Sequence, residues 1–191
     1  MNARHQVGLI FCLTFIYALL RYVILHDVAW SNVPLYVLNK SISWSGVVLF
    51  GMSLLAGEKD LRRYYGTLAF AAIVGHLFLS LMVLNPHYFA KFYGAEGRMN
   101  GVGETSMLAG VLGILFLGGL FFINLKGRSE DGASLRAGWG RMVLWCAAVH
   151  VAIMGYASWM APGTWQGYLP PITLLSFMTA LYFLYARNRR T

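Results

Sequence analysis

The sequence predicts an all-α, polytopic membrane protein, a bundle of about six transmembrane helices. Of its 191 residues, 58% are hydrophobic and only 12% are charged, whereas soluble domains carry roughly 25% charged residues. The mean hydropathy is +0.59. Several largely apolar runs follow one another, each close to the ~20 residues that cross a hydrocarbon core. A soluble bundle is disfavoured, because the chain has too little polar surface to cover one.

The predicted spans are residues 7–25, 42–57, 65–84, 106–125, 139–161 and 168–186, within one domain covering 1–191. No small-residue cleavage site follows the first span, so we expect a retained helix rather than a removed signal peptide. The second span is the shortest, and the residues YVLN before it are expected to extend it. Residues 26–40 mix charged and aromatic residues with Pro34, which is typical of an interfacial segment.

Two features lie between and within the later spans. The loop 85–105 is rich in glycine, and its run HYFAKFY fits a short amphipathic turn on the membrane surface. The fourth span carries glycine at 110, 113, 118 and 119. Such small residues fit either close helix packing or the close approach of a flat macrocycle.

The basic residues indicate the orientation of the chain. One end of the predicted bundle collects Arg4, Lys59, Arg62, Arg63, Lys126, Arg128, Arg136, Arg141, Arg187, Arg189 and Arg190. The other end keeps Lys40, Lys91 and Arg98, with Arg21 inside the first span. The positive-inside rule therefore predicts that both termini lie in the cytoplasm. The net charge of +8 then favours lipid headgroups over nucleic acid as the partner.

Two histidines, His76 and His150, lie in the middle of the third and fifth spans. An ionisable side chain at bilayer depth is costly and marks a functional site by default. Counted from Arg63 and Arg141, both lie some 14–20 Å into the membrane, near its midplane. Two imidazoles at one depth on separate helices suit the axial ligands of a b-type haem. Alternatively, each histidine only hydrogen bonds to a neighbouring helix.

The remaining polar residues suggest weaker hypotheses. His87 and His26, at the outer surface, would form a second haem or metal site or simply line the rim. Arg21 would pair with haem propionates or with lipid phosphate. Cys12 and Cys146 form no CxxCH or CxxC motif, which disfavours covalent haem and iron–sulfur clusters. No acidic residue lies in the middle of a predicted span, which disfavours both a proton-driven transporter and a lipid-modifying enzyme.

Three stretches resemble the ferric-reductase-like transmembrane family, and most of all the haem-binding membrane subunits of periplasmic methionine sulfoxide reductase systems. They are LRRYYGTLAFAAIVGHLFL, GETSMLAGVLGILFLGGLFFINL and GWGRMVLWCAAVHVAIMGYASW, within a likeness over about residues 42–186. The resemblance implies a bacterial inner membrane protein with six helices, cytoplasmic termini, and haem ligands at His76 and His150. The family commonly has Trp-x-x-Leu-His early in the fifth helix. Here Trp139 is followed by Gly140, Arg141, Met142 and Val143, so the resemblance implies one haem.

The expected function is that of a membrane b-type cytochrome holding one haem b. It would take electrons from the cytoplasmic side or from the quinol pool, with a quinone or a flavin supplied by a partner as the carrier. It would pass them to a periplasmic or membrane partner, as the electron-transfer subunit of an oxidoreductase. The alternative is a non-redox accessory subunit within a larger membrane complex.

Overall fold

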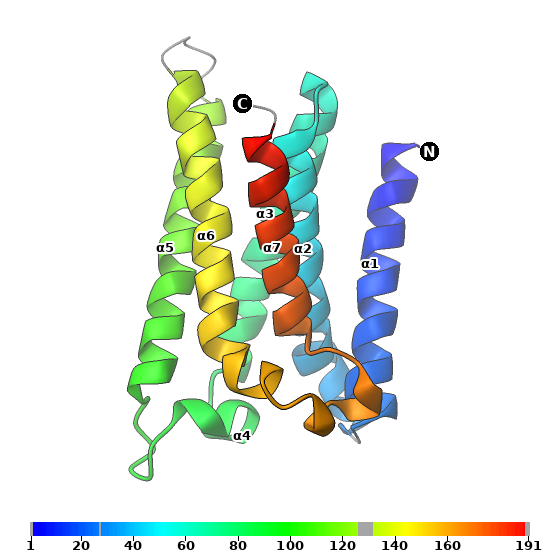
Figure 1. Cartoon of the computed structure of the whole chain (residues 1–191), viewed down its shortest axis with the longest axis vertical. Coiled ribbons are helices and arrows are strands. Elements are labelled where there is room, and N and C mark those ends of the chain that lie inside the picture. Colours follow the sequence, from blue (N-terminus) through cyan, green and yellow to red (C-terminus); the bar gives the residue numbers. More distant parts are fainter. Residues whose placement is uncertain (1, 27, 126–131, 190–191) are drawn as a thin grey trace.

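The computed structural model describes residues 2–26, 28–125 and 132–189. Within them, six long helices run along the bundle (Figure 1): α1 (Ala3–Leu19), α2 (Leu38–Leu55), α3 (Lys59–Val83), α5 (Gly101–Leu125), α6 (Gly132–Trp159) and α7 (Ile172–Asn188). The β pairing among the described residues is a single bridge between Tyr93 and Met99. The predicted all-α class is confirmed.

Short helical segments occupy the connections. A π-helix, Leu20–Ile24, continues α1, and a 3₁₀ turn, Trp30–Asn32, and a π-helix, Val33–Val37, lead into α2. The run HYFAKFY forms α4 (Pro86–Phe89) and the 3₁₀ turn Ala90–Phe92. Two further 3₁₀ turns, Pro162–Thr164 and Gln166–Tyr168, precede α7. The helix of the second span therefore does begin earlier, as the residues YVLN suggested.

Five segments are long and apolar enough to cross a membrane: Ala3–Ile24, Lys59–Val83, Gly101–Asn124, Leu135–Trp159 and Gln166–Asn188. The helix α2 is not among them, since Asn39, Lys40 and several serines lower its hydropathy. The protein is thus a multi-pass helical membrane protein, and a sixth crossing by α2 stays a prediction.

The helices extend beyond the apolar runs that predict them. For example, α3 begins at Lys59 rather than at 65, and α6 begins at Gly132 rather than at 139. Polar first turns remain helical because the backbone hydrogen bonds of a helix do not depend on side-chain polarity. Hydropathy marks only the apolar middle of each helix, so the predicted bounds are too narrow there.

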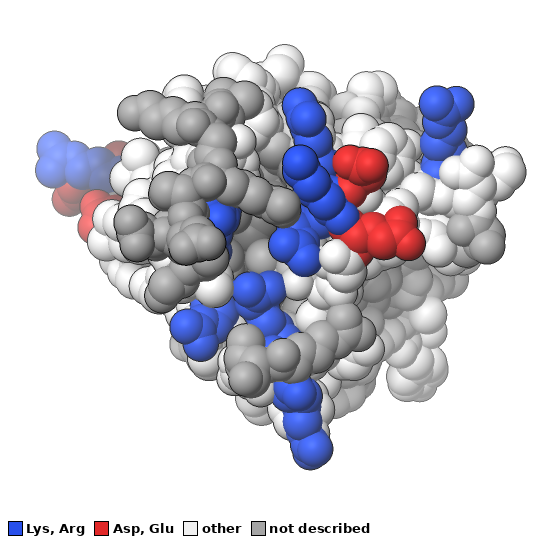
Figure 2. Space-filling model, turned by 90° about the horizontal axis from the view of Figure 1, so that it is seen from above, with Lys and Arg blue, Asp and Glu red and all other residues white. Residues whose placement is uncertain are grey.

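The two ends of the bundle differ in charge. Both termini lie at one end, here called the terminal end, while α4 and residues 160–171 lie at the other, the α4 end (Figure 1). Figure 2 views the terminal end, where Lys and Arg side chains gather with few acidic ones. An excess of basic residues is expected on the cytoplasmic side. The charge pattern agrees with the predicted orientation, which itself stays a prediction.

The polar residues of α2 place it at the centre of the bundle. It packs against α1, α3 and α7, while α5 packs chiefly against α6. Thr14 on α1 and Ser45 on α2 bring their hydroxyl oxygens within 2.6 Å, and the Trp44 indole donates to Thr179 Oγ1 on α7 at 3.1 Å. Hydroxyl groups of this kind join helices where water is absent. The helix with the weakest apolar signal therefore holds three others together.

Candidate functional site

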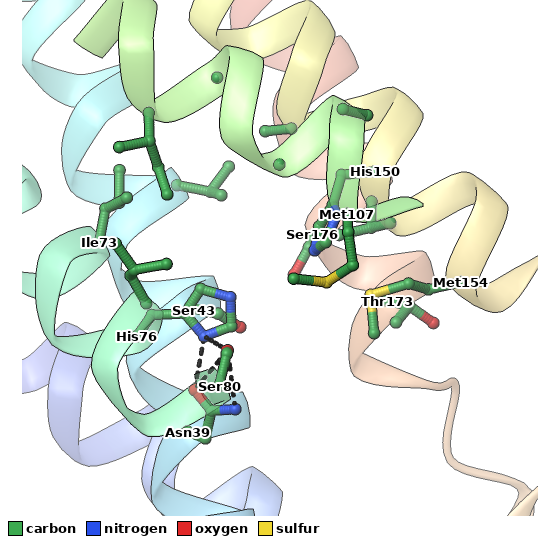
Figure 3. Close-up of a pocket in the computed structure, with 18 of the residues that line it drawn as sticks. Asn39, Ser43, Ile73, His76, Ser80, Met107, His150, Met154, Thr173 and Ser176 are labelled. Atoms are coloured by element: carbon green, nitrogen blue, oxygen red, sulfur yellow. Dashed lines mark hydrogen bonds between the residues drawn. The ribbon is translucent and has the colours of Figure 1, made fainter. Parts of the chain in front are cut away.

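A partly open cavity lies between α2, α3, α5, α6 and α7, from the middle of the bundle toward the α4 end. The cavity has a volume of about 170 Å³. Apolar side chains form most of the wall. The polar lining residues are Asn39, Lys40, Ser43, His76, Ser80, His150, Thr173 and Ser176. Both predicted haem ligands therefore line one cavity, on opposite sides of it (Figure 3).

The imidazole of His76 is oriented by α2. Its Nδ1 lies 2.6 Å from Asn39 Oδ1 and 3.3 Å from Ser80 Oγ, one turn along α3. Asn39 Nδ2 in turn donates to Ser80 Oγ at 3.1 Å. With its amide nitrogen on Ser80, Asn39 presents an oxygen to the ring, and an amide oxygen can only accept. Nδ1 therefore carries a proton, and in the neutral ring Nε2 keeps its lone pair.

The imidazole of His150 is oriented by α5 in the same way. Its Nδ1 lies 2.7 Å from the main-chain carbonyl oxygen of Ser106, and the Ser106 hydroxyl lies 3.2 Å from it. A carbonyl can only accept, so Nδ1 again donates, and in the neutral ring Nε2 is the unprotonated nitrogen. The ring lies against α5 at Gly110, where an added Cβ would lie 3.1 Å from Nδ1.

The two histidines thus share one arrangement. Each fixes its ring through Nδ1, and neither Nε2 has a hydrogen-bond partner among the residues that the structure describes. A histidine that binds a metal through one nitrogen usually donates the other N–H to a carbonyl or carboxylate, which sets its tautomer and orientation. Both residues already have this form.

The two histidines lie at similar distances from the α4 ends of their helices. His76 lies seven residues before the end of α3 at Val83, and His150 lies nine before the end of α6 at Trp159. At ~1.5 Å per residue, they are roughly 10 and 14 Å from the α4 ends of their helices. The depths match, and each histidine lies nearer the middle of its helix than the α4 end of that helix. Their depth within a bilayer stays a prediction.

Lys40 is a cavity residue that the sequence did not single out as functional. It lines the cavity toward the α4 end. Its ammonium lies over the rings of Tyr36, Tyr22 and Phe89, at 4.4, 5.0 and 5.7 Å from their centroids. Asn39 was missed as well. Both residues lie just before the predicted span 42–57, in the segment 26–40 that the sequence assigned to an interface, and the signal was a polar pair next to an apolar run.

Arg21 lies outside the cavity lining. Its side chain is 5% exposed, its Nη1 donates to the carbonyl of Leu169, and its guanidinium lies 5.3 Å from the Tyr22 ring centroid. Its Nε has no hydrogen-bond partner among the described residues. The guanidinium thus ties the π-helix after α1 to the segment before α7, and a propionate contact stays a prediction.

His26 and His87 are exposed at the α4 end and do not line the cavity. The helix α3 ends before Pro86, so His87 does not continue the face of His76. It instead starts α4, where its N–H donates to Asn85 Oδ1 at 3.0 Å. The described residues contain no group of three or more His, Cys, Asp or Glu able to hold a metal. A second site there stays a prediction.

The glycines of α5 serve helix packing. An added Cβ at Gly113 would meet Cys146, and one at Gly119 would overlap Trp139, both on α6. Gly110 and Gly113 also line the cavity, so close packing and space for a ligand coincide there. Gly118 faces open space.

No described acid reaches the cavity. Glu58, Asp60, Glu96 and Glu104 are exposed, and Asp27, Glu130 and Asp131 lie outside the described residues. The lining therefore offers nitrogen ligands and one ammonium but no carboxylate among the described residues.

Comparison of the chain with models of known protein families and with curated proteins gave no match.

Proposed function

We propose that this chain is a membrane b-type cytochrome that holds one haem b in the cavity between α3 and α6. The carrying observation is that His76 and His150 line one cavity, each with its Nδ1 beside an oxygen acceptor and its Nε2 without a hydrogen-bond partner among the described residues. These two nitrogens would be the axial ligands. When bound, the haem supplies one-electron redox chemistry, while the protein sets its ligation and its surroundings.

The ligand set and the walls suit this group. Asn39 and the Ser106 carbonyl hold the imidazoles in the tautomer that binds iron and raise their basicity. The apolar side chains that make up most of the wall exclude water, and exclusion of water is one of the factors that set a haem potential. No rearrangement of protons is needed before ligation.

The size of the cavity sets one condition on the proposal. About 170 Å³ is close to the ~150 Å³ of an engineered cavity that binds benzene. A porphyrin is several times larger than benzene, so it would extend through the open side of the cavity. The helices α3 and α5 make few contacts with each other, and we therefore expect this seam to widen on binding.

We further propose that the cytochrome transfers electrons within a larger system as a subunit of an oxidoreductase. The helical bundle accounts for the described residues and leaves no soluble redox domain among them. The donor would be a quinol or a partner's flavin, and the acceptor a partner at the α4 end, toward which the cavity extends. If the terminal end lies in the cytoplasm, the α4 end faces the periplasm.

The test is a visible spectrum of the purified protein, expressed with added haem, before and after dithionite. We expect a Soret band and a sharp reduced α-band, both lost in His76→Ala and in His150→Ala. His26→Ala and His87→Ala are the matched controls, because these exposed histidines do not line the cavity, and they should keep the spectrum. A stable but colourless protein would overturn the proposal and favour the non-redox accessory subunit.

A further inference from the structure

We infer that Lys40 binds a carboxylate of the ligand that occupies the cavity. The inference rests on the proposed function, in which that ligand is a haem and the carboxylates are its propionates. It assigns to Lys40 the role that the sequence suggested for Arg21.

Lys40 lies at the cavity beside a residue that orients one of the two histidines. It directly follows Asn39, which orients His76, and both residues line the cavity. Tyr22, Tyr36 and Phe89 surround its ammonium at the α4 end. These three rings come from three separate segments: the π-helix Leu20–Ile24, the π-helix Val33–Val37 and α4. Tyr36 also stacks on Tyr88, with ring centroids 5.7 Å apart. This aromatic cage holds the charge at the cavity rather than letting it extend into solvent.

The ammonium of Lys40 has no carboxylate partner among the described residues. Among the described residues the single ion pair is Arg98–Glu96, so no described carboxylate compensates Lys40. Aromatic faces attract a cation but do not neutralise it, and a charge without a counter-ion is costly at membrane depth. A ligand that brings a carboxylate to the cavity would remove that cost.

The two neighbouring cations, Arg21 and Lys91, are each directed to a main-chain carbonyl. Arg21 is directed to Leu169 and away from the lining. Lys91, on the turn after α4, donates to the carbonyl of Met154 on α6. Burial, and next the nearby charge of Lys40, lower the pKa of Lys91 to about 8. The α4 end of the cavity is therefore positive, and Lys40 is its lining cation.

The experiment compares two ligands that differ only in their carboxylates. The apoprotein, in nanodiscs of zwitterionic lipid, is titrated with haem and with haem dimethyl ester. Wild type should bind haem at least about tenfold more tightly, as expected for a charge-assisted hydrogen bond. Lys40→Met should bind both ligands alike with His76 and His150 still ligating, while Lys40→Arg should keep most of the preference. Arg98→Met, an exposed cation of the same end, should behave as wild type.

The outcomes separate the two proposals. Equal binding of the two ligands by wild type, or an unchanged preference in Lys40→Met, overturns the role of Lys40 and leaves the cytochrome intact. Binding that depends on added anionic lipid but not on the ester also overturns it, because Lys40 would then hold a headgroup phosphate. A wild type that binds neither porphyrin overturns both.

Discussion

The Nδ1 atom of His76 on α3 lies 2.6 Å from the amide oxygen of Asn39 on α2. Through this contact, the helix with the weakest apolar signal orients one of the two imidazoles of the cavity. The equivalent contact of His150 is to a main-chain carbonyl, which no substitution can remove directly. A substitution can therefore remove the acceptor that orients His76, but not the one that orients His150.

Replacing Asn39 should change haem affinity and potential separately. Asn39→Leu removes the acceptor and leaves the ring free to rotate, so we expect a loss of about 10–100-fold in affinity. Asn39→Asp keeps an acceptor and adds negative charge, which should lower the midpoint potential. Haem titration and redox potentiometry measure these effects. Ser43→Ala is the control, since Ser43 lines the cavity on the same helix but donates to Lys40 O. Equal effects at both positions would contradict the positioning role.

Replacing Gly110 should weaken ligation by His150. The Cβ of Gly110→Ala would lie 3.1 Å from Nδ1 and 3.3 Å from Cε1 of His150, so the ring must shift. We expect several-fold lower haem occupancy, read as the haem-to-protein ratio. Gly118→Ala on the same helix meets nothing within 4 Å. Because Ala favours a helix over Gly by roughly 0.5–1 kcal/mol, that control should be neutral or stabilising. A parallel loss in both variants would indicate damage to α5 alone.

The orientation can be tested with two matched cysteines. Gly57 lies at the terminal end and Gly163 at the α4 end, and an added Cβ at either meets nothing within 4 Å. In a background lacking Cys12 and Cys146, an impermeant maleimide should label Gly163→Cys in spheroplasts and Gly57→Cys only after lysis. Labelling in the opposite order would place the termini outside the cytoplasm.

Lys91 should be unusually reactive for a lysine. Desolvation and the nearby charge of Lys40 lower its pKa to about 8. A lowered pKa means that the neutral, nucleophilic amine is already half populated near pH 8. Competitive acylation at that pH should therefore modify Lys91 faster than Lys59, which is exposed at the terminal end. Lys40→Met should raise the pKa of Lys91 and slow its reaction. An unchanged rate would show that the two charges do not interact.

The sequence alone determined the helical class, the approximate position of each helix and the asymmetry of charge. These properties depend on local composition: apolar runs form helices in a membrane, and Lys and Arg remain at their ends. His76 and His150 also stood out from sequence, because a histidine within an apolar run is rare. Their matched depth followed from counting along helices that run in the same direction.

The tertiary structure decided what surrounds those histidines. Residues 39 and 76 are 37 positions apart, and residues 106 and 150 are 44 apart, so no local pattern could pair them. The same holds for Lys40, whose aromatic neighbours come from segments on both sides of it in the chain. Only packing decides which polar groups face one another across helices, because periodicity gives the face of a helix but not its neighbour. That is why the sequence suggested Arg21 as the cavity's cation, whereas the folded chain places Lys40 there.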